Sequence, residues 1–187
     1  VRIPDDQRLG EVGEGWRVSI TTLMNERMAI GGGIATGFPE IHELVSRTNI
    51  EGQPALEDAN VQSKLADWYV KSSGLKNNAN RMITALSKGE LPGPENSIGK
   101  LVAGNMMQDI AKFAIDLQGP GGVLVDPQVA EGAARFQAML LRSPAVRIEG
   151  GTDQILRNII GERVLGLPED MRADKGMPFN EIPTSGS

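Results

Sequence analysis

The sequence predicts an all-α protein, built as an antiparallel four-helix bundle with short extra helices. Three observations favour this fold class. Four long segments repeat apolar residues at the three-to-four-residue spacing of a helix, short breaks rich in glycine and proline separate them, and 40% of the 187 residues are hydrophobic. A chain of this length and apolar content suffices for one domain with a sizeable core.

The periodic segments place the individual helices. Long helices are expected over residues 16–33, 56–86, 98–117 and 126–142, and short ones over residues 38–45 and 153–165. Asp126 is the predicted N-cap of the fourth long helix, with Pro127 at its first position and Ser143-Pro144 as its end. Thr152 is the predicted N-cap of the last helix. Residues 48–54 are expected to be a loop.

The chain is expected to divide into three regions. Residues 1–14 are interpreted as the end of a β domain and a linker, because Val1 to Pro4 has the pattern of a strand end, and one strand cannot form a sheet alone. Residues 15–168 form the predicted bundle. Residues 169–187 are polar, contain two prolines, and are expected to form an extended tail.

Composition excludes several classes of function. The chain has 19 basic and 24 acidic residues, so its net charge of −5 argues against a general nucleic-acid binder. It has no cysteine, which excludes disulfides and thiolate metal sites. Its single histidine, His42, has no neighbouring residues that indicate a metal site. No apolar run approaches the roughly 20 residues of a membrane span, and no signal peptide opens the chain, so a cytoplasmic protein is expected.

The first long helix has an unusual charged pair. Its apolar face consists of Trp16, Ile20, Leu23 and Ile30, spaced at about 100° per residue. On the same helical wheel Arg27 lies within this face and Glu26 on its border. A charged side chain on a buried face is costly unless it has a partner. The pair is therefore a candidate for function.

A second candidate segment lies near the C-terminus, where Gly150–Ile155 is followed by Arg157–Gly166. These residues resemble the C-terminal domain of flavin-dependent acyl-CoA dehydrogenases. Val1–Pro4 is similar to the last strand of that family's middle β domain, and Asp174–Phe179 to the tail of bacterial members. The resemblance implies α,β-dehydrogenation of an acyl-CoA thioester to a trans-2-enoyl-CoA in lipid metabolism. It also implies FAD as cofactor, electron-transfer flavoprotein as acceptor, and a homo- or heterotetramer.

The resemblance also implies candidates for the catalytic base. Many members have glutamate immediately before the Gly-Thr pair, where this chain has Gly150. A minority, similar to the isovaleryl and long-chain types, has the base on the first helix before an arginine, which corresponds to Glu26 before Arg27. Glu26 is thus the predicted base and Arg27 a substrate-binding residue on the CoA side. Glu149 is the competing base if a local bulge redirects it, and otherwise it is a solvated carboxylate in a turn. Alternatively, Glu26 only neutralises Arg27.

Further site residues are implied around the flavin. The Gly150 N–H would bind the thioester carbonyl beside Gly151, which is predicted to bind substrate. Thr152, Asp153 and Gln154 would contact FAD, unless the segment is only a capped helix start. Gln118, Gly119 and Gly121 match the family's glycine-rich flavin turn, although Pro120 replaces a glycine and Asp116 stands where glutamine is usual. The turn alone is also typical of a loop.

Arg47 lies in a segment that departs from the family's pattern. The family's Arg-x-x-Phe-Gly segment contacts the FAD of a neighbouring subunit, whereas Arg47 is followed by Thr-Asn-Ile-Glu. This departure favours an alternative in which the chain is a non-catalytic helical partner subunit of a heteromeric enzyme, with Arg47 a surface charge. An acyl-CoA oxidase is a third alternative. Met106, Met107 and Met139 could line an acyl channel or fill the core.

Overall fold

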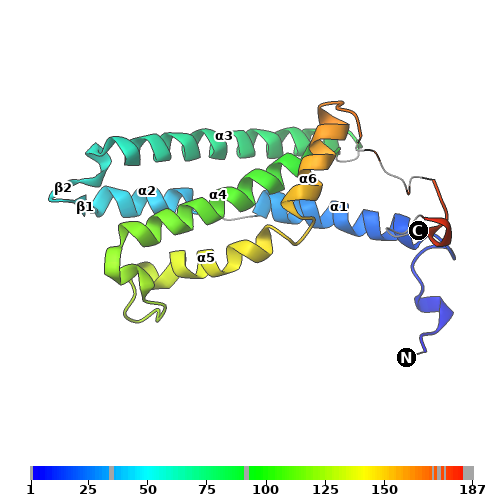
Figure 1. The fold of residues 1–187 in the computed structure, drawn as a ribbon, viewed down its shortest axis with the longest axis horizontal. Coiled ribbons are helices and arrows are strands. Elements are labelled where there is room, and N and C mark those ends of the chain that lie inside the picture. Colours follow the sequence, from blue (N-terminus) through cyan, green and yellow to red (C-terminus); the bar gives the residue numbers. More distant parts are fainter. Residues whose placement is uncertain are drawn as a thin grey trace.

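The computed structural model describes residues 2–33, 36–90, 93–169, 171, 174 and 176–182. Its helices in these ranges are α1 (Gly15–Gly33), α2 (Phe38–Arg47), α3 (Ala59–Ser87), α4 (Asn96–Leu117), α5 (Arg135–Val146) and α6 (Asp153–Ile159). In Figure 1, α1 and α2 follow one another along one row, and α3, α4 and α5 form three further rows that alternate in direction. The predicted all-α, antiparallel four-helix bundle is therefore confirmed.

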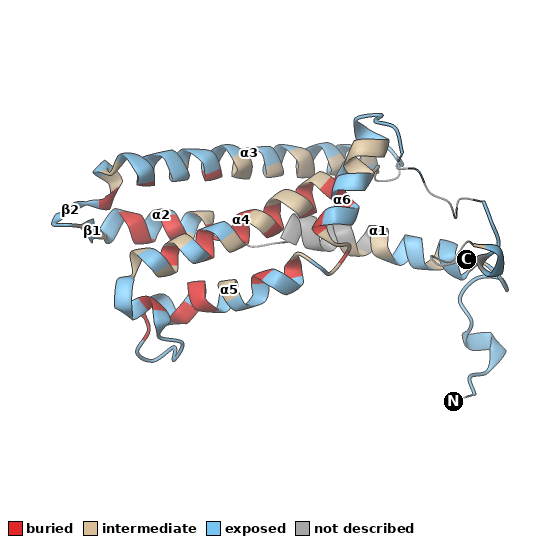
Figure 2. Ribbon diagram, in the orientation of Figure 1, coloured by how far each residue is buried: buried red, intermediate tan, exposed pale blue. Residues whose placement is uncertain are grey.

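The core lies around α4, which packs against α1, α2, α3, α5 and α6. Figure 2 shows buried positions along α4, α2 and α5. The largest buried side chains include Ile41 and Leu44 of α2, Trp68 of α3 and Ile110 of α4. The ring of Trp68 meets Phe113 of α4 edge-on, with ring centroids 5.3 Å apart.

The three methionines considered for an acyl channel belong to this packing. Met106 and Met107 on α4 are 1% and 8% exposed, and Met139 on α5 packs against the core cluster. The flexible Met139 side chain also approaches Gly37, the residue just before α2, which has a left-handed conformation at φ 83°. Their positions agree with the core-packing alternative.

The segment between α2 and α3 is more ordered than the predicted loop. Strands β1 (Asn49–Ile50) and β2 (Gln53–Pro54) form an antiparallel pair around a two-residue turn. Both turn residues, Glu51 and Gly52, have positive φ angles of 50° and 83°, as a tight hairpin turn requires. Helix α3 then begins at Ala59 rather than at residue 56, because the Asp58 carboxylate caps it, accepting from the N–H of Asn60 and of Val61.

The prediction for the start of α5 was wrong. The Asp126 carboxylate accepts from the N–H of Gln128 at 2.9 Å, but no α-helix follows this cap. A 3-10 turn over Glu131–Ala134 intervenes, and its last three residues have φ angles of 60°, 54° and 57°. Right-handed helices cannot propagate through left-handed residues. The helix therefore begins only at Arg135.

The predicted end of α5 was also wrong, because the helix continues through Pro144 to Val146. Proline has no N–H and leaves the carbonyl four residues earlier, that of Leu140, without its helical donor. The hydroxyl of Ser143 donates to this carbonyl at 2.8 Å. The serine that precedes the proline thus replaces the missing hydrogen bond.

The last helix was predicted correctly at its start. Thr152 Oγ1 accepts from the N–H of Ile155 at 3.3 Å and caps α6. After Ile159 the chain continues as a π-helical turn over Ile160–Val164. Gly166, with φ 69°, follows the end of this turn, in agreement with the predicted stop.

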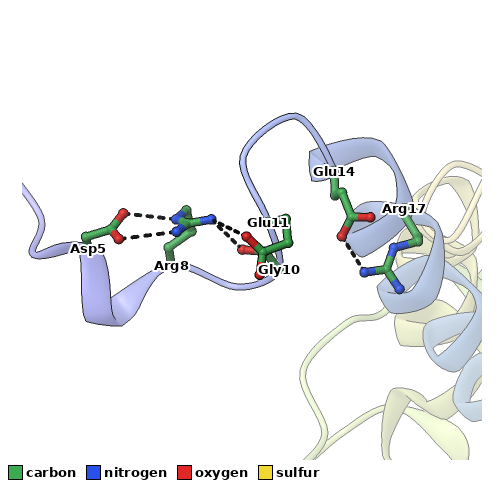
Figure 3. Close-up of polar contacts among 6 residues, drawn as sticks. All are labelled: Asp5, Arg8, Gly10, Glu11, Glu14 and Arg17. Carbon is green, nitrogen blue, oxygen red and sulfur yellow. Dashed lines mark hydrogen bonds and ion pairs between the residues drawn. The ribbon is translucent and has the colours of Figure 1, made fainter.

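The N-terminal segment has no strand within residues 2–14 and contains only a 3-10 helix, Asp5–Gln7. Figure 3 shows its polar contacts: Arg8 donates to Asp5 at 2.9 Å and to the Gly10 carbonyl at 2.8 Å, and Arg17 pairs with Glu14. These contacts are exposed and link near neighbours in sequence. The assignment of residues 1–14 to a β domain stays a prediction.

In the C-terminal tail, the structure describes a 3-10 helix over Phe179–Glu181. Within the described ranges, none of the helices is long and apolar enough to cross a membrane.

Candidate active site

The segment Gly150–Gln154 comprises the end of the connection between α5 and α6 and the first two residues of α6. Gly150 is buried at φ 64°, and Gly151 has φ 113°. Side chains strongly disfavour the conformation of Gly151, so the turn requires glycine there. The result is a sharp bend that places the peptide groups of Gly150, Gly151 and Thr152 at the N-terminal end of α6.

Lys100 of α4 fixes this bend from inside the bundle. Its side chain is 0% exposed, and its Nζ donates to the Gly151 carbonyl at 2.6 Å. A hydrogen bond from an ammonium is shorter and stronger than one between neutral groups. The two residues are 51 positions apart in sequence, so this contact ties the segment to the central helix.

Asp153, the first residue of α6, is buried and is held by a second set of contacts. Its Oδ2 accepts from Arg147 Nε at 2.7 Å and lies 2.7 Å from Nη2, and it accepts from Asn105 of α4 at 3.2 Å. Arg147 Nη1 donates in turn to Gln108 of α4. Asp153 is 2% exposed, yet its Oδ1 has no hydrogen-bond partner among the described residues.

A pocket of about 250 Å³ opens beside this ion pair. The residues lining it are Gln108, Pro144, Arg147, Ile148, Thr152, Asp153 and Gln154. The structure therefore brings together Thr152, Asp153 and Gln154, which the sequence predicted to contact FAD. Their contact with a cofactor stays a prediction.

The glycine-rich turn forms a 3-10 helix, Gly119–Val123, directly after α4. Gln137 of α5 donates from Nε2 to Gln118 Oε1 and to the Gly122 carbonyl, both at 3.0 Å. A Cβ atom on Gly122 would lie 2.3 Å from the Ile115 carbonyl oxygen, so this position must be glycine. By contrast, Gly119 and Gly121 are exposed, with nothing within 4 Å of an added Cβ.

The two candidate bases have different surroundings. Glu26 is partly buried on α1, which packs against α4. The side chain of Arg27 lies outside the described residues, so its predicted contact with substrate is not placed. Glu149 is 32% exposed at its side chain and pairs with Arg142 at 2.5 Å.

Arg47 lies on the surface near the end of α2. Its side chain is 51% exposed and pairs with Glu43 at 3.6 Å and with Glu131 at 3.3 Å. These partners agree with the alternative that Arg47 is a surface charge, and the predicted contact with a neighbouring subunit's FAD stays a prediction.

Sequence analysis missed the residues that hold the site from behind. Lys100, Asn105, Gln108 and Gln137 were not predicted, whereas Arg147 belongs to the segment from Arg147 to Gln154 that the sequence marked as part of a site. One signal was available for Lys100: it lies three and seven residues before Ala103 and Met107, on an apolar face of the helix. A lysine in such a register indicates a buried cation with a specific acceptor.

Comparison with known proteins decides the family. Residues 13–165 match the domain family described as acyl-CoA dehydrogenase, C-terminal domain. The chain belongs to the acyl-CoA dehydrogenase family. It is 31% identical over 168 residues to the acyl-CoA dehydrogenase FadE34 of Mycobacterium tuberculosis, covering 90% of this chain and 22% of that protein. It is 32% identical over 168 residues to IpdE1 of Mycolicibacterium smegmatis, covering 88% and 40%.

Solved structures of acyl-CoA dehydrogenases have the same fold. The enzyme from Geobacillus kaustophilus superposes with a TM-score of 0.72 at 22% identity, covering 87% of this chain and 42% of that one. The Tcur3481–Tcur3483 steroid ACAD gives a TM-score of 0.72 at 22% identity, covering 90% and 44%. The chain thus spans less than half the length of these relatives and corresponds to their helical C-terminal domain.

Proposed function

We propose that the protein containing this chain is an FAD-dependent acyl-CoA dehydrogenase that converts an acyl-CoA into a trans-2-enoyl-CoA. The observation that supports this function best is the segment Gly150–Gln154, held against α4 by the buried side chains of Lys100 and Asp153. A loop with only a connecting role does not need two buried charged groups to fix it. The family assignment supplies the reaction.

The residues around the pocket fit a flavin nucleotide. The N–H of Thr152 has no acceptor among the described residues, and the buried Asp153 Oδ1 has no donor. Both residues line the pocket, and an unpaired donor and an unpaired acceptor on its lining residues suit the amide and hydroxyl groups of FAD. Thr152, Asp153 and Gln154 would hold it there, with Gln118, Gly119 and Gly121 as further proposed contacts. Bound there, FAD would supply the acceptor for the hydride that leaves the β-carbon of the substrate.

The proton chemistry is assigned to this chain's own residues. Glu26 is the proposed base that removes the α-proton, and the N–H of Gly150 donates to the thioester carbonyl, where negative charge develops. Gly151 and Arg27 are the proposed substrate contacts. Glu149 is the weaker candidate, because its carboxylate would have to leave Arg142 before it could reach a substrate.

Partners are proposed from relatives of the same fold. One solved structure with a TM-score of 0.72 is described as the electron-transferring flavoprotein of Acidaminococcus fermentans. Another, with a TM-score of 0.69, is the ChsE4–ChsE5 complex of Mycobacterium tuberculosis. We propose electron-transfer flavoprotein as acceptor and a tetramer, homomeric or heteromeric. The departure from the family's Arg-x-x-Phe-Gly segment after Arg47 motivates the second candidate function, a non-catalytic partner subunit of a heteromeric enzyme.

The test uses the full-length protein with its natural partner subunits. Acyl-CoA oxidation is followed with an artificial electron acceptor, and FAD content is measured from the flavin absorbance. Glu26→Gln is expected to lower kcat by about 100-fold or more while FAD stays bound, since a positioned base contributes about 10²- to 10⁴-fold. The exposed Glu57→Gln is the matched control.

The outcomes separate the candidates. Loss of turnover only in Glu149→Gln would transfer the role of base to that residue. Turnover that survives both substitutions would favour the non-catalytic subunit. Rapid reoxidation by oxygen without the artificial acceptor would identify an oxidase.

A further inference from the structure

The buried ammonium of Lys100 is not accounted for by packing alone. Its side chain is fully buried on α4, in the same register as Ala103 and Met107, where an apolar residue would fit. Burial of an ammonium is unfavourable unless specific acceptors replace its water. The Gly151 carbonyl accepts a hydrogen bond from Lys100 Nζ at 2.6 Å. Lys100 thus acts on the backbone of the candidate site.

The bond to Gly151 has a consequence for Thr152. The Gly151 carbonyl and the Thr152 N–H belong to one planar peptide group, and the described chain has no cis peptide. In a trans peptide the C=O and the N–H point in opposite directions. Because the Gly151 carbonyl points toward Lys100, the Thr152 N–H points away from Lys100. This N–H has no acceptor among the described residues.

The conformation of Gly151 explains why its peptide group needs a partner to hold its orientation. At φ 113° the residue is in a region that glycine enters freely, and a glycine backbone has more alternative conformations than any other residue. Without a partner for its carbonyl, the peptide could rotate and redirect the Thr152 N–H. The N-cap bond of Thr152 acts on its side chain and does not fix the preceding peptide group.

We propose that Lys100 is a positioning residue for FAD: by holding the Gly151 carbonyl, it directs the Thr152 N–H at a hydrogen-bond acceptor of the cofactor. This inference rests on the proposed FAD-dependent function. It assigns Lys100 an effect on cofactor affinity that a lysine serving only to join α4 to the connecting segment would not have.

The test compares Lys100→Met with Lys112→Met in the full-length protein. Both substitutions remove an ammonium from α4 and keep an unbranched side chain, but Lys112 is exposed. The apo-protein is titrated with FAD well below the melting temperature of each variant. Loss of one directed hydrogen bond is expected to raise the Kd for FAD about three- to tenfold in Lys100→Met. Lys112→Met should bind like the wild type.

Hydrogen–deuterium exchange gives a readout that does not depend on activity. In the apo-protein, the peptide covering residues 148–156 should exchange faster in Lys100→Met than in Lys112→Met. A variant that melts at a lower temperature but binds FAD as tightly as the wild type would overturn the proposal, since Lys100 would then only stabilise the fold.

A second variant keeps the proposal testable if Lys100→Met does not fold. Gly151→Ala leaves α4 intact but disfavours the φ of 113°, so the same peptide must move. It is expected to weaken FAD binding while Lys100 is present, and unchanged affinity would contradict the proposal. If the wild-type protein binds FAD and the variants bind it with the same affinity, only the positioning role of Lys100 is refuted. Wild-type protein that does not bind FAD would refute the proposed function as well.

Discussion

Helices α4 and α1 are similar in length, at 22 and 19 residues, but differ in what surrounds them. Helix α4 is covered on most sides, and even its polar residues Asn96, Ser97 and Lys100 are buried. In the described first half of α1, Trp16 is 78% exposed and Ile20 37% exposed, although both belong to the helix's apolar face (Figure 2). An apolar period therefore identifies a face suited to burial, but not whether the chain itself covers that face.

The same contrast separates the polar contacts of the two regions. Ion pairs near α1, such as Arg8 with Asp5, join neighbours in sequence at the surface, where a pair contributes about 0–1 kcal/mol. The contacts of Lys100 and Asp153 link α4 to residues about 50 positions away, and both of these side chains are buried. We expect substitutions around α4 to have large effects and those at the start of α1 small ones.

The strongest test of this contrast is Trp68→Ala. Trp68 is 2% exposed and packs edge-on against Phe113 of α4. Its removal should lower the free energy of unfolding by about 3–5 kcal/mol, because the cavity cannot close completely. Urea denaturation followed by circular dichroism measures this loss. A change below about 1 kcal/mol, as for an ordinary surface substitution, would show that the core is not centred on α4.

Gly122→Ala should have the next largest effect, about 3 kcal/mol, since an overpacked site must move its neighbours. The added Cβ would lie 2.3 Å from the Ile115 carbonyl oxygen, a backbone atom at the end of α4. Gly121→Ala is the matched control, because nothing lies within 4 Å of its added Cβ. Thermal melts of the two variants should differ clearly, and equal melting temperatures would contradict the close approach.

Asp153→Asn should cost about 2 kcal/mol, less than the roughly 3–5 kcal/mol of a fully buried pair, because the Arg147 side chain is 35% exposed. The substitution leaves the arginine without its carboxylate and disturbs the contact with Asn105. Asp109→Asn, at an exposed position of α4, is the control. Chemical denaturation measures both, and an equal loss in the two variants would argue that the ion pair does not hold α6 against α4.

Trp16→Ala should have the smallest effect. In the 187-residue chain it should change the free energy of unfolding by less than about 0.5 kcal/mol, as expected for a residue that makes little buried contact. A loss comparable to that of Trp68→Ala would show that α1 packs more closely than its exposure indicates. A larger loss in the full-length protein than in this chain would indicate that other sequence covers Trp16.

Sequence patterns predicted the elements whose signals are local. The Thr152 cap was identified because the cap and the amide that it satisfies are three residues apart. The end of α5 was missed for a physical reason: Ser143-Pro144 normally ends a helix, but the serine hydroxyl here replaces the bond that proline removes. The prediction of the start of α5 was wrong because nothing in the sequence predicts left-handed alanines at positions 133 and 134.

For the candidate site, too, the sequence predicted the local segment but not the distant residues that contact it. The family's motif located Gly150–Gln154, and the structure gathers Thr152, Asp153 and Gln154 at one pocket. Lys100, on α4, could not be paired with Gly151 from one sequence, because the partner of a buried cation depends on how distant helices pack. The position of Glu26 relative to Gly150 stays a prediction for the same reason.

The central place of α4 also has a consequence for synthesis of the chain. Its packing partners come both before it, in α1 to α3, and after it, in α5 and α6. When α4 leaves the ribosome, the face that will meet α5 and α6 is still uncovered, and Lys100 has not yet met Gly151. This domain therefore cannot finish folding until α6 has emerged, and a nascent chain stalled before residue 135 exposes apolar surface for chaperones to bind.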